Sequence, residues 1–353
     1  MCELKVYKLG DACTELSDGL HKAPIFVEGG DYIFVNAKNI AKGFIVDNDP
    51  TKKSTKEEYL KYSSPLNETT ILYSIDGTIG NIALYRGEKC ILGKGACYMN
   101  PNPQILDRMY LYYTLQSPHF NAYIDQMSTG STIQHISLKT MRNYVFTCPP
   151  LDEQKQIASV LSSLDDKIDL LNRENATLEA MAETLFRQWF IEDAKEDWEE
   201  KPLSSIATFL NGLACQKYPP KNEIEKLPVL KIRELTNGIG ADSDWATTDV
   251  GEEYIVQSGD VIFAWSASLM VKIWDGEDCI LNQHLFKVTS TTYPKWFYYL
   301  WCKHHLNEFI AIAQSHATTM GHIKRNDIDT AMVLVPSPDE LKILSETMEP
   351  IFS

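Results

Sequence analysis

The clearest pattern of hydrophobic positions lies at the centre of the chain, after Pro149 and Pro150. From there apolar residues recur in alternating steps of four and three positions, with one polar residue in the series. The series is Ile157, Leu161, Leu164, Ile168, Leu171, Asn175, Leu178, Ala182, Leu185 and Trp189. This spacing is the heptad repeat of a coiled coil, and it predicts a helix of about 40 residues, about 60 Å long. We place its N-cap at Asp152. The alternative is a long helix packed on a single domain.

The segments on either side of this helix resemble each other. STIQHISLKTMRNYVFTCPPLDEQKQIASVLSSL aligns with TTMGHIKRNDIDTAMVLVPSPDELKILSETMEPI, at an offset of 187 for both His135 and His322 and for Pro149 and Pro336. GEKCIL answers GEDCIL at an offset of 189. The chain is therefore predicted to be a tandem duplication with small insertions.

Each repeat contains patterns of both strands and helices. YIFVNAKNI and LPVLKIREL are typical of strands, and ILYSIDGTIGNIALY and DVIFAWSASLMVKIW are typical of paired strands around a turn. RMYLYYTLQSPHFNAYI and KWFYYLWCKHHLNEFIAI carry apolar residues at helical spacing and predict one helix each. We therefore expect two mixed α+β domains joined by the central helix.

The heptad series needs a partner helix, and the second repeat supplies the beginning of one. Counterparts of the first three apolar positions are Leu344, Met348 and Ile351. This second helix extends for about two heptads or less before Ser353 and contains Pro350, so we expect either a shortened helix or a partner on another chain. Asn175 within the series is typical of a residue that fixes helix register. The predicted organisation is a first domain at 1–148, a central helix at 149–194, a second domain at 195–335 and the start of a second helix at 336–353.

The distribution of charged residues along the chain matters more for the predicted function than the net charge. The net charge of -15 argues against nucleic acid, because phosphate contacts need Lys and Arg. Residues 1–145, however, hold 15 Lys+Arg against 15 Asp+Glu, whereas residues 146–200 hold 5 against 14 and residues 201–353 hold 13 against 19. The first domain can therefore present a basic face.

Cysteines and hydrophobic runs bear on location. The eight cysteines are scattered, without a CxxC pair or a zinc-finger spacing, which is typical of free thiols in a reducing compartment. The N-terminal sequence has no apolar signal region and the chain has no run long enough to cross a bilayer. We expect a cytoplasmic protein that does not contact a membrane.

The duplicated junction carries a family resemblance. A domain that ends in GST-x-Q-x-I and continues as VFTCPPLDEQKQIASVLSSLD-x-KI, repeated once, resembles the specificity subunit of type I restriction-modification systems. TILYSIDGTIGNIALY and CILNQHLFKV are similar to stretches of its target-recognition domains. The resemblance covers essentially the whole chain.

The resemblance implies a DNA-binding function without catalysis. In that family each repeat is a target-recognition domain that reads one half of a bipartite double-stranded DNA site, and two long helices form an antiparallel coiled coil that sets the spacing. Two methyltransferase subunits dock on the coiled coil and restriction subunits join them. S-adenosylmethionine is bound by the methyltransferase subunit, so no cofactor and no metal is expected here. Because most of the second helix is missing, self-association through the central helix is a further expectation.

Candidate DNA-binding residues are polar residues in loops beside the repeated strands, because such side chains read base edges and phosphates. In the first domain they are Thr78, Asn81, Lys94, Ser131, Thr132, Gln134 and His135. In the second domain they are Lys231, Arg233, Ser266, Ser268, Lys272, Gln283, His284, Thr318, Thr319, His322 and Lys324. Residues that differ between the repeats are the better candidates for sequence reading, whereas matched residues such as His135 and His322 equally fit a role in holding each domain together.

Two other classes of function remain open. An enzyme would need pairs such as Asp76 with His135 or Cys97 with His119, but the sequence has no phosphate-binding loop, HExxH or GxSxG motif. A protein-protein adaptor without DNA binding is consistent with the negative net charge, whereas the duplicated junction favours the DNA-binding hypothesis.

Overall fold

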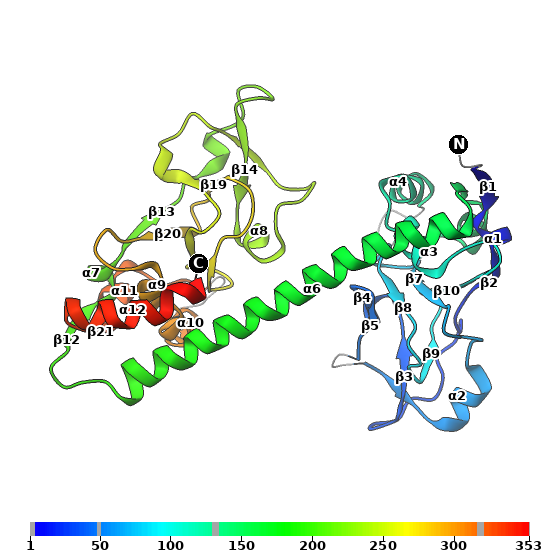
Figure 1. The fold of residues 1–353 in the computed structure, drawn as a ribbon, viewed down its shortest axis with the longest axis horizontal. Coiled ribbons are helices and arrows are strands. Elements are labelled where there is room, and N and C mark those ends of the chain that lie inside the picture. Colours follow the sequence, from blue (N-terminus) through cyan, green and yellow to red (C-terminus); the bar gives the residue numbers. More distant parts are fainter. Residues whose placement is uncertain (1–3, 48–50, 129–133, 316–320, 353) are drawn as a thin grey trace. The chain divides into compact units, whose positions relative to one another are not determined.

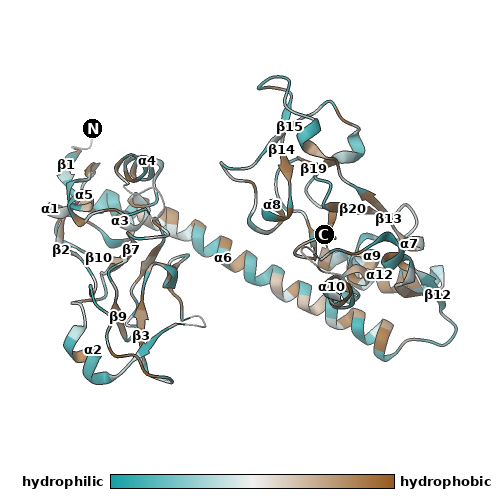
Figure 2. Ribbon diagram, turned by 180° about the vertical axis from the view of Figure 1, so that it is seen from behind, coloured by the Kyte–Doolittle hydropathy of each residue, from teal (hydrophilic) through white to brown (hydrophobic). Residues whose placement is uncertain are grey.

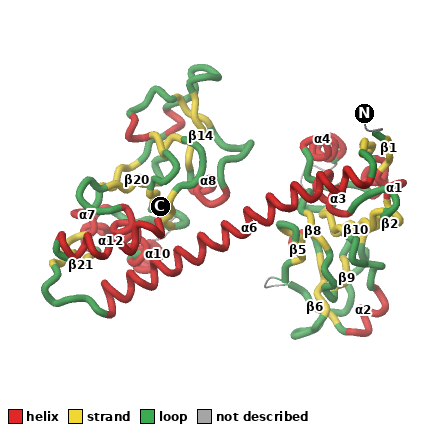
Figure 3. The backbone as a smooth tube through the Cα atoms, in the orientation of Figure 1, coloured by secondary structure: helices red, strands yellow, loops and turns green. Residues whose placement is uncertain are grey.

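The chain folds into two units, and the boundary between them falls inside one long helix. The computed structural model describes residues 4–47, 51–128, 134–315 and 321–352. Unit 1 is Met1–Leu171 and unit 2 is Asn172–Ser353, so that both units contain part of α6 (Leu151–Arg187). Figure 3 shows that each unit mixes strands and helices, as expected for the predicted α+β class.

Unit 1 is built around a four-stranded antiparallel sheet in the order β2-β10-β7-β8 (Figure 1). These strands are β2 (Cys13–Asp18), β10 (Ala96–Pro101), β7 (Ile71–Ser74) and β8 (Ile82–Leu84). A second sheet contains β6 (Lys53–Ser54), β3 (Tyr32–Val35) and β9 (Cys90–Leu92), with β3 and β9 parallel. Two further pairs are β1 (Lys5–Lys8) with β11 (Val145–Cys148), and β4 (Ile40–Ala41) with β5 (Phe44–Ile45). The helices are α1 (Leu9–Ala12), η1 (Ala37–Asn39), α2 (Lys56–Tyr62), α3 (Arg108–Thr114), α4 (Pro118–Met127) and α5 (Leu138–Asn143).

Unit 2 repeats this plan. Its four-stranded sheet has the order β13 (Thr208–Asn211), β20 (Leu285–Thr289), β17 (Val261–Ala264) and β18 (Met270–Ile273). Its second sheet contains β15 (Trp245–Thr247), β14 (Lys226–Leu230), β19 (Cys279–Leu281) and β16 (Ile255–Val256), and β12 (Glu199–Pro202) pairs with β21 (Met332–Val335). The matching order of strands, including the parallel pair β14 and β19, confirms the predicted duplication. The helical segments are η2 (Gln188–Glu192, a π-helical turn), α7 (Leu203–Ile206), η3 (Cys215–Lys217), α8 (Ile232–Asn237), η4 (Glu252–Tyr254), α9 (Lys295–His304), α10 (Leu306–Ser315), α11 (Arg325–Thr330) and α12 (Pro338–Phe352).

The prediction of one helix in each aromatic-rich segment is wrong. In unit 1 the segment forms α3 and α4, because Pro118 lacks the N–H that a continuing helix needs and Ser117 caps the new helix by accepting from the Phe120 amide. In unit 2 it forms α9 and α10, with a break at His305. Apolar periodicity identified the buried faces but did not detect these breaks.

The start of α6 also differs from the prediction. The helix begins at Leu151, so Asp152 lies in its first turn and is not its N-cap. Two residues further on, the buried Gln154 side chain binds unit 1. Its Oε1 accepts from the Asp107 amide at 2.9 Å, and its Nε2 donates to the carbonyls of Ile105 at 3.0 Å and Pro149 at 2.8 Å. The glutamine of the PPLDEQ sequence therefore anchors the helix to the domain that precedes it.

Gln154→Ala is expected to destabilise unit 1 by about 2 kcal/mol, because three backbone groups lose a partner in a buried place. Urea denaturation followed by circular dichroism measures the loss. All seven tryptophans lie in unit 2, so tryptophan fluorescence should report an unchanged transition for that unit. The exposed neighbour provides the control Gln156→Ala; equal behaviour of the two variants would contradict the anchoring role.

The heptad series is covered in its second half only. Ala182 belongs to the core of unit 2 together with Met348 of α12. Leu178 and Ile351 line one pocket, whereas Trp189 and Leu344 line another, so α12 runs antiparallel to this half of α6. The repeat-derived partner helix is therefore present in unit 2.

The first half of the series lies in contact with water. Residues 163–177 of α6 are all exposed, including Leu164 at 56% and Ile168 at 57%. Figure 2 shows hydrophilic and hydrophobic residues alternating along this helix. The apolar positions from Leu164 to Leu171, which we call the open seam, have no partner helix among the described residues.

Candidate nucleic-acid interface

The predicted site residues of unit 1 gather around the turn between β7 and β8. The Ile75 amide donates to the Gly95 carbonyl at 3.0 Å, and the Ile136 amide donates to the Ile75 carbonyl at 2.9 Å. Asp76 forms an isolated β-bridge with His135. Three segments that are distant in sequence, around residues 76, 94 and 135, are therefore held side by side by backbone bonds.

The same backbone arrangement recurs in unit 2. The Trp265 amide bonds the His284 carbonyl at 3.4 Å, and the Ile323 amide bonds the Trp265 carbonyl at 3.1 Å. Ser266 forms the β-bridge with His322. Position by position, Asp76, Lys94, Gly95 and His135 thus correspond to Ser266, Gln283, His284 and His322.

The side chains at these positions form what we call the first polar cluster in unit 1. Lys94 Nζ lies 3.8 Å from Asp76 Oδ2, and His135 Nδ1 lies 4.0 Å from Asp76 Oδ1. Half of the Lys94 side chain and about a third of the Asp76 side chain are exposed, at 51% and 30%. The cluster presents a cation and an anion side by side at the surface.

The second polar cluster in unit 2 consists of Ser266, Gln283, His284 and His322. Ser266 Oγ lies 3.0 Å from His284 Nδ1, and Gln283 Nε2 lies 3.4 Å from His284 Nε2. The Trp265 ring packs beside both imidazoles, with ring centroids 6.0 Å from His284 and 6.2 Å from His322. This cluster presents an amide and imidazoles instead of a salt bridge.

The remaining unit 1 candidates have different surroundings. Thr78 and Gln134 are exposed near the first polar cluster, and the Gly77 amide bonds the Gln134 carbonyl. Asn81 Nδ2 donates to the Ala37 carbonyl at 3.4 Å, while its amide donates to Ser74 Oγ. Asn81 therefore supports the turn. Ser131 and Thr132, like Thr318 and Thr319, lie outside the described residues.

Three basic candidates of unit 2 are paired with nearby acids. Lys231 binds Asp244, Arg233 binds the buried Glu234, and Lys272 binds Asp275 at 2.9 Å. Lys272 also lines the pocket that contains Asn175 and Ile351, away from the second polar cluster. The two other candidates, Ser268 beside Ser266 and Lys324 at the start of α11, are exposed.

Three residues in or beside these clusters are not among the DNA-binding candidates that the sequence indicates. Asp76 enters there only as half of an enzymatic pair, and neither Gly95 nor Trp265, which packs beside the second polar cluster, enters at all. Aligning the two repeats across the turns, position by position, is the signal that could have found them.

Cys97 and His119, one of the two residue pairs considered for an enzyme, have separate surroundings. Cys97 is buried in the unit 1 core, where desolvation raises the pKa of its thiol, whereas His119 Nδ1 bonds the Tyr144 hydroxyl at 2.8 Å. Within the described parts of the chain no group of His, Cys, Asp and Glu could hold a metal ion. Nor is any helix of those parts long and apolar enough to cross a membrane.

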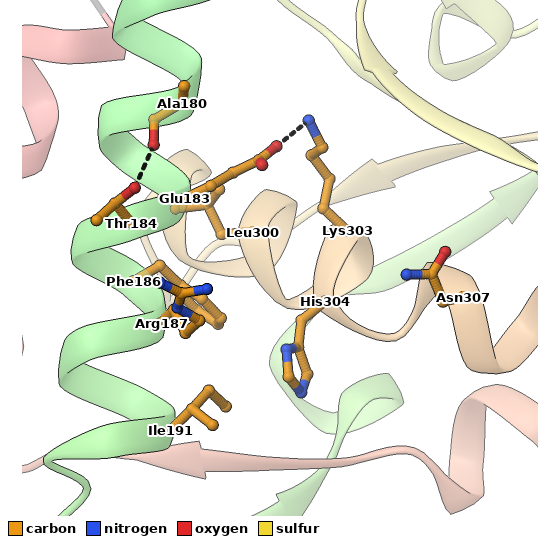
Figure 4. Close-up of a pocket in the computed structure, with 10 residues that line it drawn as sticks. All are labelled: Ala180, Glu183, Thr184, Phe186, Arg187, Ile191, Leu300, Lys303, His304 and Asn307. Carbon is orange, nitrogen blue, oxygen red and sulfur yellow. Dashed lines mark hydrogen bonds and ion pairs between the residues drawn. The ribbon is translucent and has the colours of Figure 1, made fainter.

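The second half of α6 is fixed to α9 by a polar network beside a cavity of about 540 Å³ (Figure 4). Lys303 pairs with both Glu179 and Glu183 of α6, and the Tyr299 hydroxyl donates to Glu179. Burial by itself raises the pKa of Glu179, but the bonds from Lys303 and Tyr299 outweigh it, so that this pKa lies below its ordinary value. The network keeps this half of the helix in place against α9.

Comparison with known proteins identifies a family. The family model described as the type I restriction modification DNA specificity domain matches residues 1–180 and 195–353, once for each repeat. The type I restriction enzyme MjaIX specificity subunit of Methanocaldococcus jannaschii is 24% identical over 92% of this chain and 81% of its own length. The EcoBI specificity subunit of Escherichia coli is 24% identical over 45% of this chain and 33% of its own length. The crystal structure of a type I restriction-modification S subunit from M. genitalium has a similar fold, with a TM-score of 0.55 and 14% identity over 99% of this chain and 91% of that one.

Proposed function

The chain belongs to the type I restriction-modification DNA specificity family, and we propose that each of its two units reads one half of a bipartite DNA site. Recognition of a DNA sequence is the role of this family, and the chain is a specificity subunit with two target-recognition domains. The observation that carries the proposal is the recurrence of one backbone arrangement in both units with different side chains upon it. Two domains that recognise different half-sites need the same backbone arrangement but different side-chain contacts to the bases.

The long helix fits the role of a spacer between the two readers. Its 37 residues correspond to about 55 Å, which exceeds the 34–36 Å of one turn of duplex DNA by roughly half. Gln154 binds its first turn to unit 1, and the network of Glu179 and Lys303 binds its second half to unit 2. Because both ends are attached, the number of residues between them sets the gap between the half-sites.

The open seam is the surface on which we place the methyltransferase subunits, two per complex, with restriction subunits joining the assembly. Exposed apolar residues at heptad spacing are what a partner helix requires. In this proposal methyl transfer and cleavage belong to the partners, this chain contributes no catalytic group, and the complex works in the cytoplasm, where it meets DNA. Self-association through the same seam is the competing use of that surface.

Ile168→Glu with Leu171→Glu is expected to weaken co-purification with the methyltransferase subunit at least about 10-fold, because two charges are placed on the apolar face. The matched control, Ser163→Glu with Asn172→Glu, adds the same two negative charges to exposed residues of the same stretch that are not among the apolar positions of the heptad series. Size-exclusion chromatography of the free chain distinguishes loss of a methyltransferase contact from loss of a homodimer. Unchanged co-purification of the seam variant would contradict this placement.

The function itself is tested by producing the chain with the methyltransferase subunit encoded beside it, in a host that lacks adenine methylation, and mapping modified bases in the genome. We expect a gapped, bipartite motif modified on both halves. If the two proteins co-purify and no base is modified, the chain acts as a protein-protein adaptor and the proposal is wrong for it.

A further inference from the structure

The two polar clusters occupy the same place in their units but carry different chemistry. Asp76 and Lys94 correspond to Ser266 and Gln283. Asp76 and Ser266 lie on the turns that follow β7 and β17, whereas Lys94 lies between β9 and β10 and Gln283 lies between β19 and β20. Gly77 and Ala267, which follow in the two turns, both adopt positive φ, at 75° and 58°. The backbone of each cluster thus has the same form, which glycine adopts without strain and Ala267 adopts at a cost, and the side chains on it vary.

Stability does not explain why these side chains are present. The Asp76–Lys94 pair is partly exposed and its charges are 3.8 Å apart, and ion pairs of this kind contribute little to the free energy of folding. Gln283 is a half-buried polar residue of the segment between β19 and β20, and its Nε2 lies near an exposed imidazole. Such groups are free to exchange their partners for a ligand without a large folding cost.

The first cluster matches the major-groove edge of a C·G pair. Cytosine presents its N4 amino group as a donor beside the O6 and N7 acceptors of guanine. A carboxylate accepts from the first and an ammonium donates to the second, so Asp76 and Lys94 together satisfy both bases of one pair. An A·T pair also offers one donor, N6, and two acceptors, N7 and O4, but in a different order across the groove, and Lys usually bonds guanine whereas carboxylates accept from cytosine.

The second cluster matches adenine. A glutamine amide both accepts and donates, and it bonds N6 and N7 of adenine as a pair. In this cluster the buried Ser266 hydroxyl holds His284, whose Nε2 faces the Gln283 amide. His284 therefore positions Gln283 and restricts its rotation before DNA arrives.

We propose that the two clusters are equivalent base-reading positions, at which unit 1 reads a C·G pair through Asp76 and Lys94 and unit 2 reads an A·T pair through Gln283. This inference rests on the proposed function and adds to it the residues and base pairs that make the two half-sites differ.

A transplant of the second cluster into unit 1 tests the inference. The variant carries Asp76→Ser, Lys94→Gln and Gly95→His. A side chain fits at position 95, because the nearest atom to an added Cβ is Asp76 Cβ at 3.5 Å and the backbone φ is not positive. Lys89→Gln removes an exposed charge elsewhere in the same unit and serves as the control.

Mapping modified bases in cells that contain the methyltransferase subunit gives the readout. In one half-site of the motif, the transplant should change one C·G position to A·T, with the original site modified about 10- to 100-fold less efficiently. The other half-site and the gap should stay the same. Retention of the original base at every position, in a variant that still modifies DNA, would overturn the inference.

Two further outcomes are separable. If the transplant does not assemble with the methyltransferase subunit, the single variant Lys94→Gln tests the inference. The inference is overturned if this variant still requires the original base, as strictly as before, at every position of both half-sites. If the chain without substitutions produces no bipartite motif, the proposed function is wrong, and the inference about the base-reading positions fails with it. The Lys89→Gln control should reproduce the original motif in either case.

Discussion

Phe190→Ala is expected to lower the free energy of unfolding of unit 2 by about 3–5 kcal/mol. The Phe190 ring is 1% exposed and joins the π-helical turn after α6 to the core. Its centroid lies 4.9 Å from Phe186, 5.2 Å from Trp198 and 5.5 Å from Phe297. Removing the ring leaves a cavity among large, mutually packed side chains that cannot collapse into it.

Urea denaturation followed by tryptophan fluorescence measures this loss directly, since every tryptophan belongs to unit 2. The adjacent Ile191 is 44% exposed, and Ile191→Ala should change the free energy of unfolding by no more than about 0.5 kcal/mol. A loss below about 1 kcal/mol for Phe190→Ala would mean that the end of α6 is not held by this packing.

Duplicating residues 165–171 after Leu171 is expected to widen the gap of the recognised motif by about three base pairs. Seven residues add about 10 Å to a helix, and one base pair spans about 3.4 Å. The insertion keeps the heptad phase and lies within the exposed residues 163–177, so neither the Gln154 anchor nor the contacts of α12 need to change. The base sequences of both half-sites should be retained, and mapping of modified bases shows both properties at once.

An insertion of two residues at the same place provides the contrasting case. It lengthens the helix by only about 3 Å but rotates everything after it by about 200°. Modification should therefore be lost although folding, measured by circular dichroism, is retained. A motif with the original gap in the seven-residue variant would show that α6 does not set the spacing.

Much of the fold could be predicted because the sequence contains two copies of the same domain pattern. Strand patterns around the β7–β8 and β17–β18 turns, and the duplication itself, are confirmed. The heptads gave the helix to within a few residues of its ends. The breaks at Ser117 and His305 were missed because hydrophobic periodicity continues across them, whereas capping and proline chemistry act on single residues. The four-part division at 148, 194 and 335 stays a prediction, since the contacts divide the chain within α6.

The candidate site was harder to predict than the fold. Loops beside repeated strands were the correct place to look, and Lys94, Gln283 and His284 lie together with their repeat partners. No sequence pattern indicates that Arg233 is held by Glu234, because burial of that carboxylate depends on how α8 packs. Nor did it separate Asn81, whose amide supports a turn, from side chains that are available to DNA. Whether any of these residues touches DNA stays a prediction.

The pairing of the first and last strands has a consequence for how such a protein changes over generations. In unit 1, Lys5 of β1 lies opposite Cys148 of β11, just before α6 begins, and in unit 2, Glu199 of β12 lies opposite Val335 of β21, just before α12 begins. Partners in an antiparallel ladder are about 5 Å apart. The first and last strands of each target-recognition domain thus lie side by side. Recombination at those two strands can replace the whole domain with one from another specificity subunit. The helices continue from the same point whatever domain has been exchanged, so a lineage can acquire a new DNA target without rebuilding the frame that carries it.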